Sequence, residues 1–226
     1  MSGPPETIDA GPFATWLVAT DAAISAQEET QVPCGGCTAC CTSSQFVYVG
    51  PGELDTIAHI PAALLFPAPG LPAGHYVLGY DEEGRCPMLV DGGCSIYEHR
   101  PRACRVYDCR VMAAAGVEPD LPEQEDLAAR VRQWSFGHPS ATDRVLHEAV
   151  RAAARYLGAH HHQLPVPPNA PQLAALAVEV HRCFVDDEGP RLVEPDVQAV
   201  LVELSRRRPA EMTPIRRRRG ARRGRT

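Results

Sequence analysis

The spacing of apolar residues predicts a helix near the N-terminus. The apolar positions that follow a helical period are Phe13, Trp16, Leu17 and Ile24. We expect the helix to begin near Asp9, a suitable N-cap residue, with Pro12 in its first turn, and to fade near residues 28–30. An aromatic side chain on such a stripe usually packs in the core, so Trp16 is predicted to be a core residue.

The middle of the chain predicts short strands and turns. The expected strands are residues 46–49, 75–80, 85–90 and 94–97. The last two flank the Asp-Gly-Gly sequence at residues 91–93, which is typical of a hairpin turn. Residues 53–60 and 98–112 predict short helices, with Pro101 suited to a first turn. The four prolines of residues 61–74 predict a surface loop.

The second half of the chain is predicted to be helical. The segments with apolar residues at intervals of three and four are residues 123–136, 141–157, 172–185 and 195–206. The prolines of residues 165–171 interrupt this pattern. We therefore predict an α+β fold, in which a small cysteine-rich, metal-centred module of short strands and helices packs against a helical C-terminal half.

Length and composition restrict the class of protein. With 226 residues, 44% of them hydrophobic, the chain is long enough to bury a sizeable core. No apolar run approaches the ~18–20 residues that span a bilayer, so no membrane partner is expected. The N-terminus lacks the basic and hydrophobic segments of a secretion signal. We expect a cytoplasmic protein, whose cysteines stay reduced and available to metals, and leave its oligomeric state open.

Positive charge is concentrated at the C-terminus. All 22 basic residues are arginines, and ten of them lie in residues 206–226, whose one acidic residue is Glu211. Residues 1–205 carry 12 arginines against 27 acidic residues. Residues 207–226 are predicted to be a disordered arginine-rich tail, because its charges repel one another and offer no apolar stripe. Such a tail either recruits nucleic acid or an acidic partner or remains a solvated extension.

Eight of the nine cysteines fall into two clusters. The first contains Cys34, Cys37, Cys40 and Cys41, and the second contains Cys86, Cys94, Cys104 and Cys109. Two-residue spacers and glycines let a tight turn direct several thiols at one point, so we predict that these eight residues bind metal. The odd number of cysteines, the adjacent pair and the reducing compartment count against a disulfide framework. Cys183 stands apart and is predicted to be a small buried hydrophobic residue.

The spacing of the first cluster bears on the metal. Structural zinc sites usually take their thiolates from two separated C-x2-C pairs. Bacterial iron–sulfur sites often use a C-x2-C-x2-C run and a further cysteine before proline. Cys34, Cys37 and Cys40 have this second spacing, and Cys86-Pro87 would be the distant partner. We expect iron, as a 4Fe–4S cluster, ahead of zinc, while the division of the eight thiols stays open.

Two further sets of residues have chemistry of interest. Five arginines accompany the second cluster, at positions 85, 100, 102, 105 and 110. Either they offset the negative charge of a thiolate centre, or they are solvated surface charges. The consecutive histidines at 160–162 offer metal ligands, but neighbouring side chains at a helix end usually point in different directions. We predict that these histidines face solvent.

The second cluster also shows a characteristic order of motifs. After Cys86-Pro87 come Cys94-Ser-Ile-Tyr97, Arg100-Pro101, Cys104-Arg105 and finally Cys109. Together with the CxxCxxCC run, this order resembles the YkgJ-like cysteine-cluster family, described as zinc- or iron-chelating proteins. The resemblance covers roughly residues 30–112 and implies metal chelation by the clustered cysteines. The sequence carries no nucleotide-binding, hydrolase or zinc-protease motif beside it.

Three functions remain open on the sequence alone. The first is a metal-chelating protein in metal handling or electron transfer. The second is a metal-dependent modifying enzyme, since flagellin lysine methylases carry a similar cysteine cluster, although they are larger proteins. The third is a module in which zinc is structural and the arginine tail binds nucleic acid or a protein partner. Whether the protein is an enzyme is thus left undecided.

The predicted organisation has four parts. They are an N-terminal helix packing on the core (1–29), the metal-binding module (30–112), a helical C-terminal region (113–206) and the arginine-rich tail (207–226). Much of the stability of the module should come from bound metal rather than from a large core.

Overall fold

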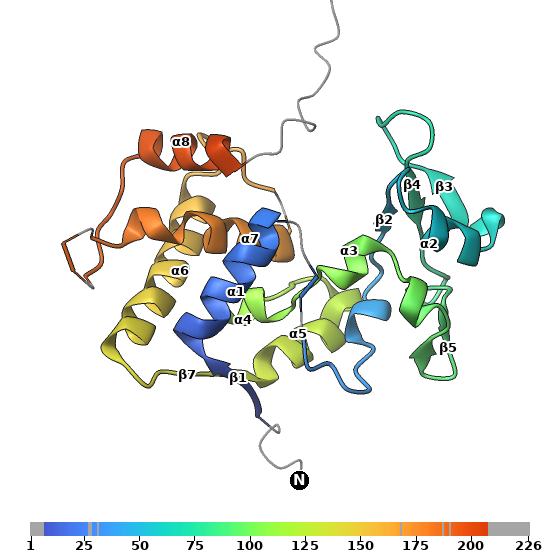
Figure 1. Cartoon of the computed structure of the whole chain (residues 1–226), viewed down its shortest axis with the longest axis horizontal. Coiled ribbons are helices and arrows are strands. Elements are labelled where there is room, and N and C mark those ends of the chain that lie inside the picture. Colours follow the sequence, from blue (N-terminus) through green and yellow to red (C-terminus); the bar gives the residue numbers. More distant parts are fainter. Residues whose placement is uncertain are drawn as a thin grey trace, which may run out of the picture.

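The computed structural model describes residues 7–26, 29–30, 32–167, 169–186, 188–189 and 191–207. These residues form a helical body and a smaller lobe of short strands and helices (Figure 1). The expected α+β class and the helical C-terminal half are confirmed. Arg207, the first residue of the predicted disordered tail, is helical instead, and the rest of the tail lies outside the described part of the chain. The proposed division into four parts stays a prediction.

The helical body collects elements from both ends of the chain. Its helices are α1 (Phe13–Ala26), α4 (Arg110–Ala115), α5 (Glu125–Gln133), α6 (Ala141–Ala159), α7 (Ala170–Val180) and α8 (Val197–Arg207). Short 3-10 helices, η4 (Pro122–Gln124) and η5 (His181–Phe184), precede α5 and follow α7. Helices α1, α4, α6 and α7 pack on one another around buried residues such as Phe13, Met112 and Val178. Trp16 lies in this core as predicted.

A capping box begins α6 and ties it to α1. The Ser140 hydroxyl accepts a hydrogen bond from the Asp143 amide, and the Asp143 carboxylate accepts one from the Ser140 amide. The same buried carboxylate also accepts a hydrogen bond from the Ala14 amide (2.9 Å). One acidic side chain therefore satisfies amides at the N-termini of two helices that are distant in sequence.

The start of α1 differs from the prediction. Asp9 and Pro12 belong to a strand, β1 (Ile8–Pro12), and the helix begins at Phe13. Strand β1 pairs in parallel with β7 (Trp134–Gly137), where a helix end was expected. In β7 the side chains alternate, with Trp134 and Phe136 buried. This pairing joins segments more than 120 residues apart, so no local pattern revealed it.

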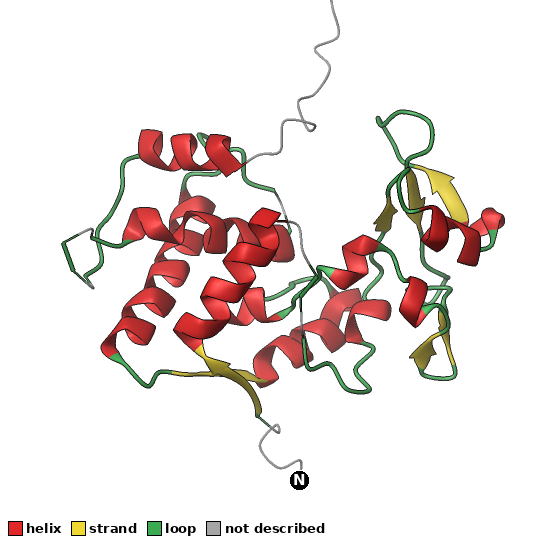
Figure 2. Ribbon diagram, in the orientation of Figure 1, coloured by secondary structure: helices red, strands yellow, loops and turns green. Residues whose placement is uncertain are grey.

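The smaller lobe is built around a three-stranded antiparallel sheet (Figure 2). Its order is β2 (Val47–Val49), β4 (Tyr76–Leu78) and β3 (Leu65–Pro67), and the hairpin β5 (Leu89–Val90) and β6 (Gly93–Cys94) lies beside it. The lobe's helical turns are η1 (Ala39–Cys41), α2 (Leu54–His59), η2 (Ala62–Leu64), η3 (Tyr97–His99) and α3 (Arg102–Arg105). The predicted loop at residues 61–74 was partly wrong, because it contains η2 and β3. Strand β3 has only three residues and depends on its partner β4 rather than on its own sequence.

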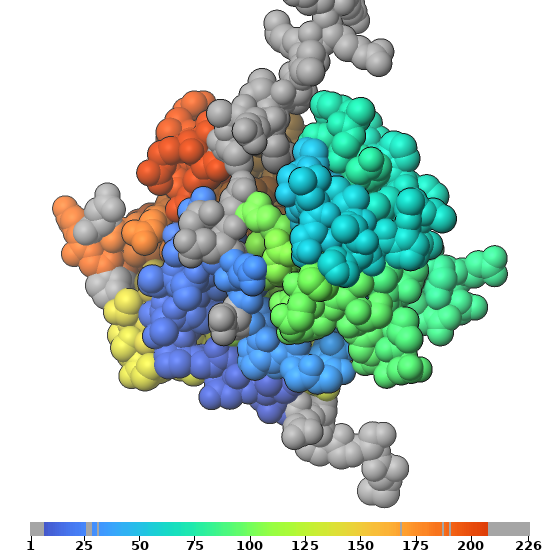
Figure 3. Space-filling view, turned by 45° about the vertical axis from the view of Figure 1, so that its right-hand side comes forward, coloured from blue at the N-terminus to red at the C-terminus, as the bar shows by residue number. Residues whose placement is uncertain are grey.

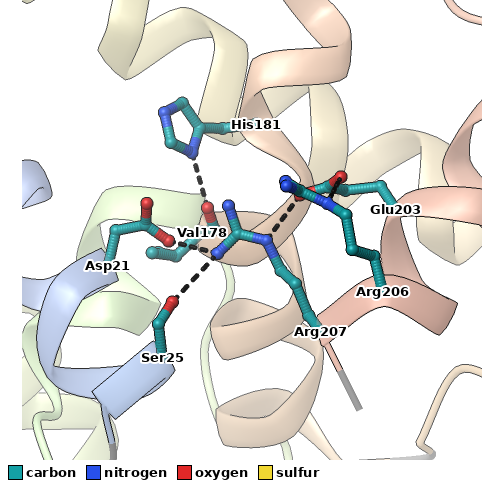
Figure 4. A network of polar contacts seen from close by, with 7 residues as sticks. All are labelled: Asp21, Ser25, Val178, His181, Glu203, Arg206 and Arg207. Atoms are coloured by element: carbon teal, nitrogen blue, oxygen red, sulfur yellow. Dashed lines mark hydrogen bonds and ion pairs between the residues drawn. The ribbon is translucent and has the colours of Figure 1, made fainter.

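Helix α8 is held to the body by partly buried ion pairs (Figure 4). The guanidinium of Arg207 contacts the carboxylates of Asp21 on α1 and Glu203 on α8. Glu203 also pairs with Arg206 (2.7 Å). The first arginines of the basic C-terminal segment are therefore bound to the protein itself. Within the described residues, no helix is long and apolar enough to cross a membrane.

Candidate metal centre

The first cysteine cluster lies in a loop that ends in η1. Gly35 has a positive φ of 56°, a conformation that favours glycine. The Cys37 amide donates a hydrogen bond to the carbonyl oxygen of Cys34 (3.0 Å), so the chain turns back between these two residues. In η1 the Sγ atoms of Cys40 and Cys41 lie 4.0 Å apart. The first cluster thus consists of a C-x2-C turn followed by an adjacent pair.

Helix α5 supports the first cluster from outside the cysteine motifs. Arg130 donates a hydrogen bond from Nη2 to the carbonyl oxygen of Cys34 (3.0 Å). The hydroxyl of Thr42, just after η1, donates to the Asp126 carboxylate (3.1 Å). The helix therefore fixes the loop at both ends of the cluster.

The second cluster begins on the β5–β6 hairpin. Asp91 and Gly92 have φ values of 49° and 76°, as the two central residues of a type I′ turn require. The predicted hairpin is present, with Cys94 opposite Leu89, but its strands are shorter than expected and Gly93 pairs with Val90 instead of lying in the turn. Cys86 and Cys94 both pack against the apolar core of the lobe. The hairpin therefore carries one cysteine on its strand and holds another at its base.

A backbone hydrogen bond joins the two clusters. The Cys86 amide donates to the carbonyl oxygen of Cys41 (2.7 Å), and the Thr30 amide donates to the carbonyl oxygen of Arg105 (3.1 Å). In Figure 3 the surface of the first-cluster segment, in light blue, borders the green surface of the second-cluster segment. Segments more than 40 residues apart in sequence therefore meet at the cysteines.

The last two clustered cysteines lie on short helices. Cys104 is in α3, and its amide donates to the carbonyl oxygen of Pro101 (2.9 Å). Cys109 is the N-cap residue of α4 and is buried in the core of the helical body. The indole Nε1 of Trp134, from β7, donates a hydrogen bond to Cys109 Sγ (3.2 Å). Cys109 therefore attaches the cysteine region to the helical body.

The pKa shifts of the buried thiols indicate which sulfurs lie near one another. Burial is the largest cause of the raised pKa of Cys109, which is about 12, and the charges of Asp108, Cys34 and Cys37 raise it further. The Trp134 hydrogen bond acts in the opposite direction. Cys109 thus lies near the first pair of the other cluster.

A different set of sulfurs surrounds Cys104. Burial raises its pKa to about 12, and the neighbouring thiols that raise it further are Cys40, Cys86 and Cys94. Burial also raises the pKa of Cys86, and the thiols of Cys94 and Cys40 add to the effect. The pKa of Cys34 is raised by burial, by Cys40 and by Cys37. Cys40 therefore acts on sulfurs of both sets.

The donor set fits a soft or borderline cation. A neutral thiol with a raised pKa loses its proton when a metal cation binds to its sulfur. Thiolate sulfur is a preferred ligand of zinc and of iron–sulfur clusters. All nine cysteines are free, so no disulfide competes for these sulfurs. No three of the described cysteine sulfurs lie within 4.8 Å of one another. The structure thus gathers the thiols into one region without closing them around a point.

The arginines near the second cluster have different surroundings. The positive charge of Arg100 lowers the pKa of the Cys104 thiol, against the larger effects of burial and neighbouring thiols. Arg85 instead pairs with Asp81, and Arg105 pairs with Glu29. The sequence also gave no indication of Arg130, whose charge lowers the pKa of Cys34, again against larger opposing effects.

Sequence reasoning missed a buried polar group next to Cys109. The carboxylate of Asp108 accepts hydrogen bonds from the Arg110 guanidinium (2.8 Å) and from the Trp16 indole (3.2 Å). The guanidinium of Arg130 lies 5.2 Å from the centre of the Trp134 ring, whose indole donates to Cys109, so a second cation lies on this side of Cys109. Residues 130 and 134 are four apart, but nothing in the local sequence connects them with Cys109.

The remaining candidates lie away from the cysteine region. Cys183 is half-buried against the helical core, and burial and Glu203 raise its pKa. In the histidine run, Nδ1 of His160 lies 2.9 Å from the carbonyl oxygen of Tyr156, and Nδ1 of His161 lies 2.9 Å from that of Gly158. These ring nitrogens contact backbone oxygens at the end of α6 rather than converging on one point.

Comparison with known proteins relates the cysteine region to one protein family. Residues 33–124 match the model of the CxxCxxCC family, described as a "putative zinc- or iron-chelating domain". No curated protein and no solved structure matches the chain. The match contains both cysteine clusters and ends before α5. The cysteine-bearing part of this chain therefore resembles the CxxCxxCC family, over less than half of the chain's length.

Proposed function

We propose that the eight clustered cysteines bind iron or zinc as thiolates in two neighbouring groups. One group consists of Cys34, Cys37 and Cys109, and the other of Cys86, Cys94 and Cys104. The adjacent residues Cys40 and Cys41 would each supply the fourth thiolate of one group. The observation that carries this proposal is the exchange between clusters, in which Cys109 lies near the first cluster and Cys40 near the second.

The proposed occupant of at least one group is an iron–sulfur cluster. The C-x2-C-x2-C spacing of the first cluster supports it. Such a cluster supplies one-electron chemistry when bound, which suits metal handling or electron transfer. The chain's own contribution is to offset the negative charge of the thiolates, through the Trp134 indole and the cations Arg130 and Arg100. Reduced thiols are needed, and we therefore propose a cytoplasmic location.

Metal analysis of anaerobically purified protein tests the proposal directly. A brown protein with iron, sulfide and an electron paramagnetic resonance signal after reduction is the expected result. The double variant Cys37→Ser/Cys40→Ser should lose most of the metal, whereas the matched control Cys183→Ala should keep all of it. If the protein is colourless and contains only zinc, the iron–sulfur assignment is wrong and zinc is the bound metal. Unchanged metal content in the double variant would refute thiolate binding by the first cluster.

Single variants test the division into two groups. Cys109→Ser should reduce the metal of the first group, and Cys104→Ser that of the second, so each should lose about half of the bound metal. The double variant Cys104→Ser/Cys109→Ser should lose nearly all of it. If either single variant loses all the metal, the eight cysteines form one site and the division is wrong.

For the basic C-terminal segment we propose a separate binding function. The eight arginines of residues 208–226, which follow the ion-paired Arg206 and Arg207, would bind a polyanion, and nucleic acid is the partner we propose. Deleting residues 208–226 keeps the Arg207 contacts with Asp21 and Glu203 intact. The truncated protein should lose salt-dependent binding to RNA and DNA without a change in metal content. Equal affinity at low salt with and without the segment would refute this part of the proposal.

A further inference from the structure

Three potential metal ligands without sulfur meet on the small lobe. They are Asp55 and His59 on α2 and His99 in η3, and one ligand atom of each lies within 4.8 Å of the others. Asp55 Oδ2 lies 2.7 Å from Nδ1 of His99, and Asp55 Oδ1 lies 3.6 Å from Nδ1 of His59. Among the residues that the structure describes, this is the one group of three or more such side chains with ligand atoms this close.

The scaffold that carries these side chains is well anchored. Asp55 and His59 are four residues apart on α2 and therefore share one face of the helix. The helix is followed by Ile60 and η3 is preceded by Ile96, both buried in the apolar core of the lobe. The carboxylate of Glu53, just before α2, accepts a hydrogen bond from the backbone amide of Arg102, just after η3. The position of α2 relative to η3 is thus fixed by contacts that do not involve the three side chains.

The two imidazole rings are arranged face to face. The ring centres of His59 and His99 lie 3.6 Å apart, and the ring planes are within 3° of parallel. Two imidazolium cations would repel each other at this distance, whereas two neutral rings would not. Neutral imidazole is the form that binds metals, because it keeps a lone pair on one nitrogen.

The carboxylate completes a mixed donor set. The hydrogen bond from His99 is the largest cause of the lowered pKa of Asp55, so this group is ionised at neutral pH. Two imidazole nitrogens and one carboxylate oxygen suit borderline divalent ions of the first transition series, whereas magnesium and calcium prefer oxygen ligands alone. The side chains are 40–70% exposed, which leaves room for water at the remaining coordination positions.

We propose that Asp55, His59 and His99 form a second metal site, which binds one zinc or ferrous ion independently of the cysteines. The cation would replace the protons that the imidazole Nδ1 atoms share with the Asp55 carboxylate and with the Asp55 carbonyl oxygen, which lies 2.8 Å from His59 Nδ1. Each ring would then carry its proton on Nε2. His99 lies between Cys94 and Cys104, so metal bound here would also fix the segment that connects these two cysteines.

The test uses full-length protein whose cysteines already hold their metal. Titration with Zn²⁺, followed by calorimetry and metal analysis after dialysis, should show one further equivalent in the wild type. The variant His59→Ala/His99→Ala should lose this equivalent and keep the cysteine-bound metal. The variant Asp55→Asn should weaken its binding by about 10-fold or more. Titration with Co²⁺ should show the weak visible bands of nitrogen and oxygen ligands, with no thiolate charge-transfer band.

A matched control removes two other exposed, neighbouring histidines. The rings of His161 and His162 have centres 3.6 Å apart, yet they belong to no such group of ligands. His161→Ala/His162→Ala should therefore keep the further equivalent. If it loses this equivalent, or if His59→Ala/His99→Ala keeps it, the proposal is refuted and the Asp55–His99 contact is a surface ion pair only. Circular dichroism of each variant shows whether a loss of metal comes from unfolding. If the double histidine variant unfolds, Asp55→Asn, at an exposed position, tests the site instead.

Discussion

The helical body and the small lobe obtain their stability in different ways. In the body, α1, α4, α6 and α7 enclose a continuous core that includes the fully buried residues Phe13 and Met112. Among the described residues, the core of the lobe consists of Val49, Ile60, Leu78, Met88 and Ile96. A core of this size supplies little hydrophobic free energy against the entropy of ordering some 60 residues. Packing of the core therefore accounts for the stability of the body. We attribute the remaining stability of the lobe to bonds between its cysteines and metal.

Removal of the metal should affect the two regions most unequally. We expect chelation to unfold the lobe while the body stays folded, because structural metal sites contribute on the order of 10 kcal/mol. Hydrogen exchange measured by mass spectrometry should show loss of protection in residues 47–105 and retained protection in α6 and α7. If the lobe stays protected without metal, its small core is sufficient and the comparison fails.

Truncation of a core side chain should destabilise the helical body and leave the metal of the lobe in place. Phe13→Ala removes a fully buried ring from the body and should cost about 3–5 kcal/mol of unfolding free energy. Metal content of the folded protein should not change. Val18→Ala, an exposed position on the same helix, serves as the control and should have almost no effect on thermal unfolding. A loss of metal in folded Phe13→Ala would show that the two regions are energetically coupled.

The body should also respond to pH through a buried histidine. His147 stacks on Phe13, with ring centres 4.2 Å apart, and burial, together with Arg151 and His138, lowers its pKa from 6.5 to about 4. Below pH 6.5 the unfolded chain gains a proton that the folded protein does not bind, so stability falls as the pH decreases from 6.5 to 4 and is fully present above 6.5.

The expected loss is about 3 kcal/mol over this interval. Chemical denaturation at a series of pH values measures it. His147→Gln should flatten this part of the profile, and an equally steep decrease in that variant would assign the effect to other groups.

The smallest predicted effect lies where the two regions meet. Trp134→Phe keeps most of the buried ring and removes the indole hydrogen bond to Cys109. Loss of this bond should raise the pKa of Cys109 further and weaken metal binding about 10-fold, or about 1.4 kcal/mol. Competition with a coloured chelator measures the change. An identical affinity in Trp134→Phe would mean that this contact serves packing alone.

The sequence by itself determined the local features of this protein. The apolar stripes predicted α5, α6, α7 and α8, and the Asp-Gly turn predicted the β5–β6 hairpin, because each depends on neighbours within a few positions. The same holds for the cysteine motifs, whose spacing and order indicated the family that residues 33–124 match. These motifs indicated which cysteines are the candidate metal ligands, but the local patterns left open which thiols lie together.

Only the tertiary structure decided how distant segments meet. It placed Cys109 near Cys34 and Cys37, put the Trp134 indole on the Cys109 sulfur, and brought His99 to the face of α2 that carries Asp55 and His59. It also formed the β1–β7 pair from segments expected to be helix ends. Contacts of this kind depend on how the helices and strands pack around the two cores, and residues that are far apart in sequence leave no periodic signal of their meeting.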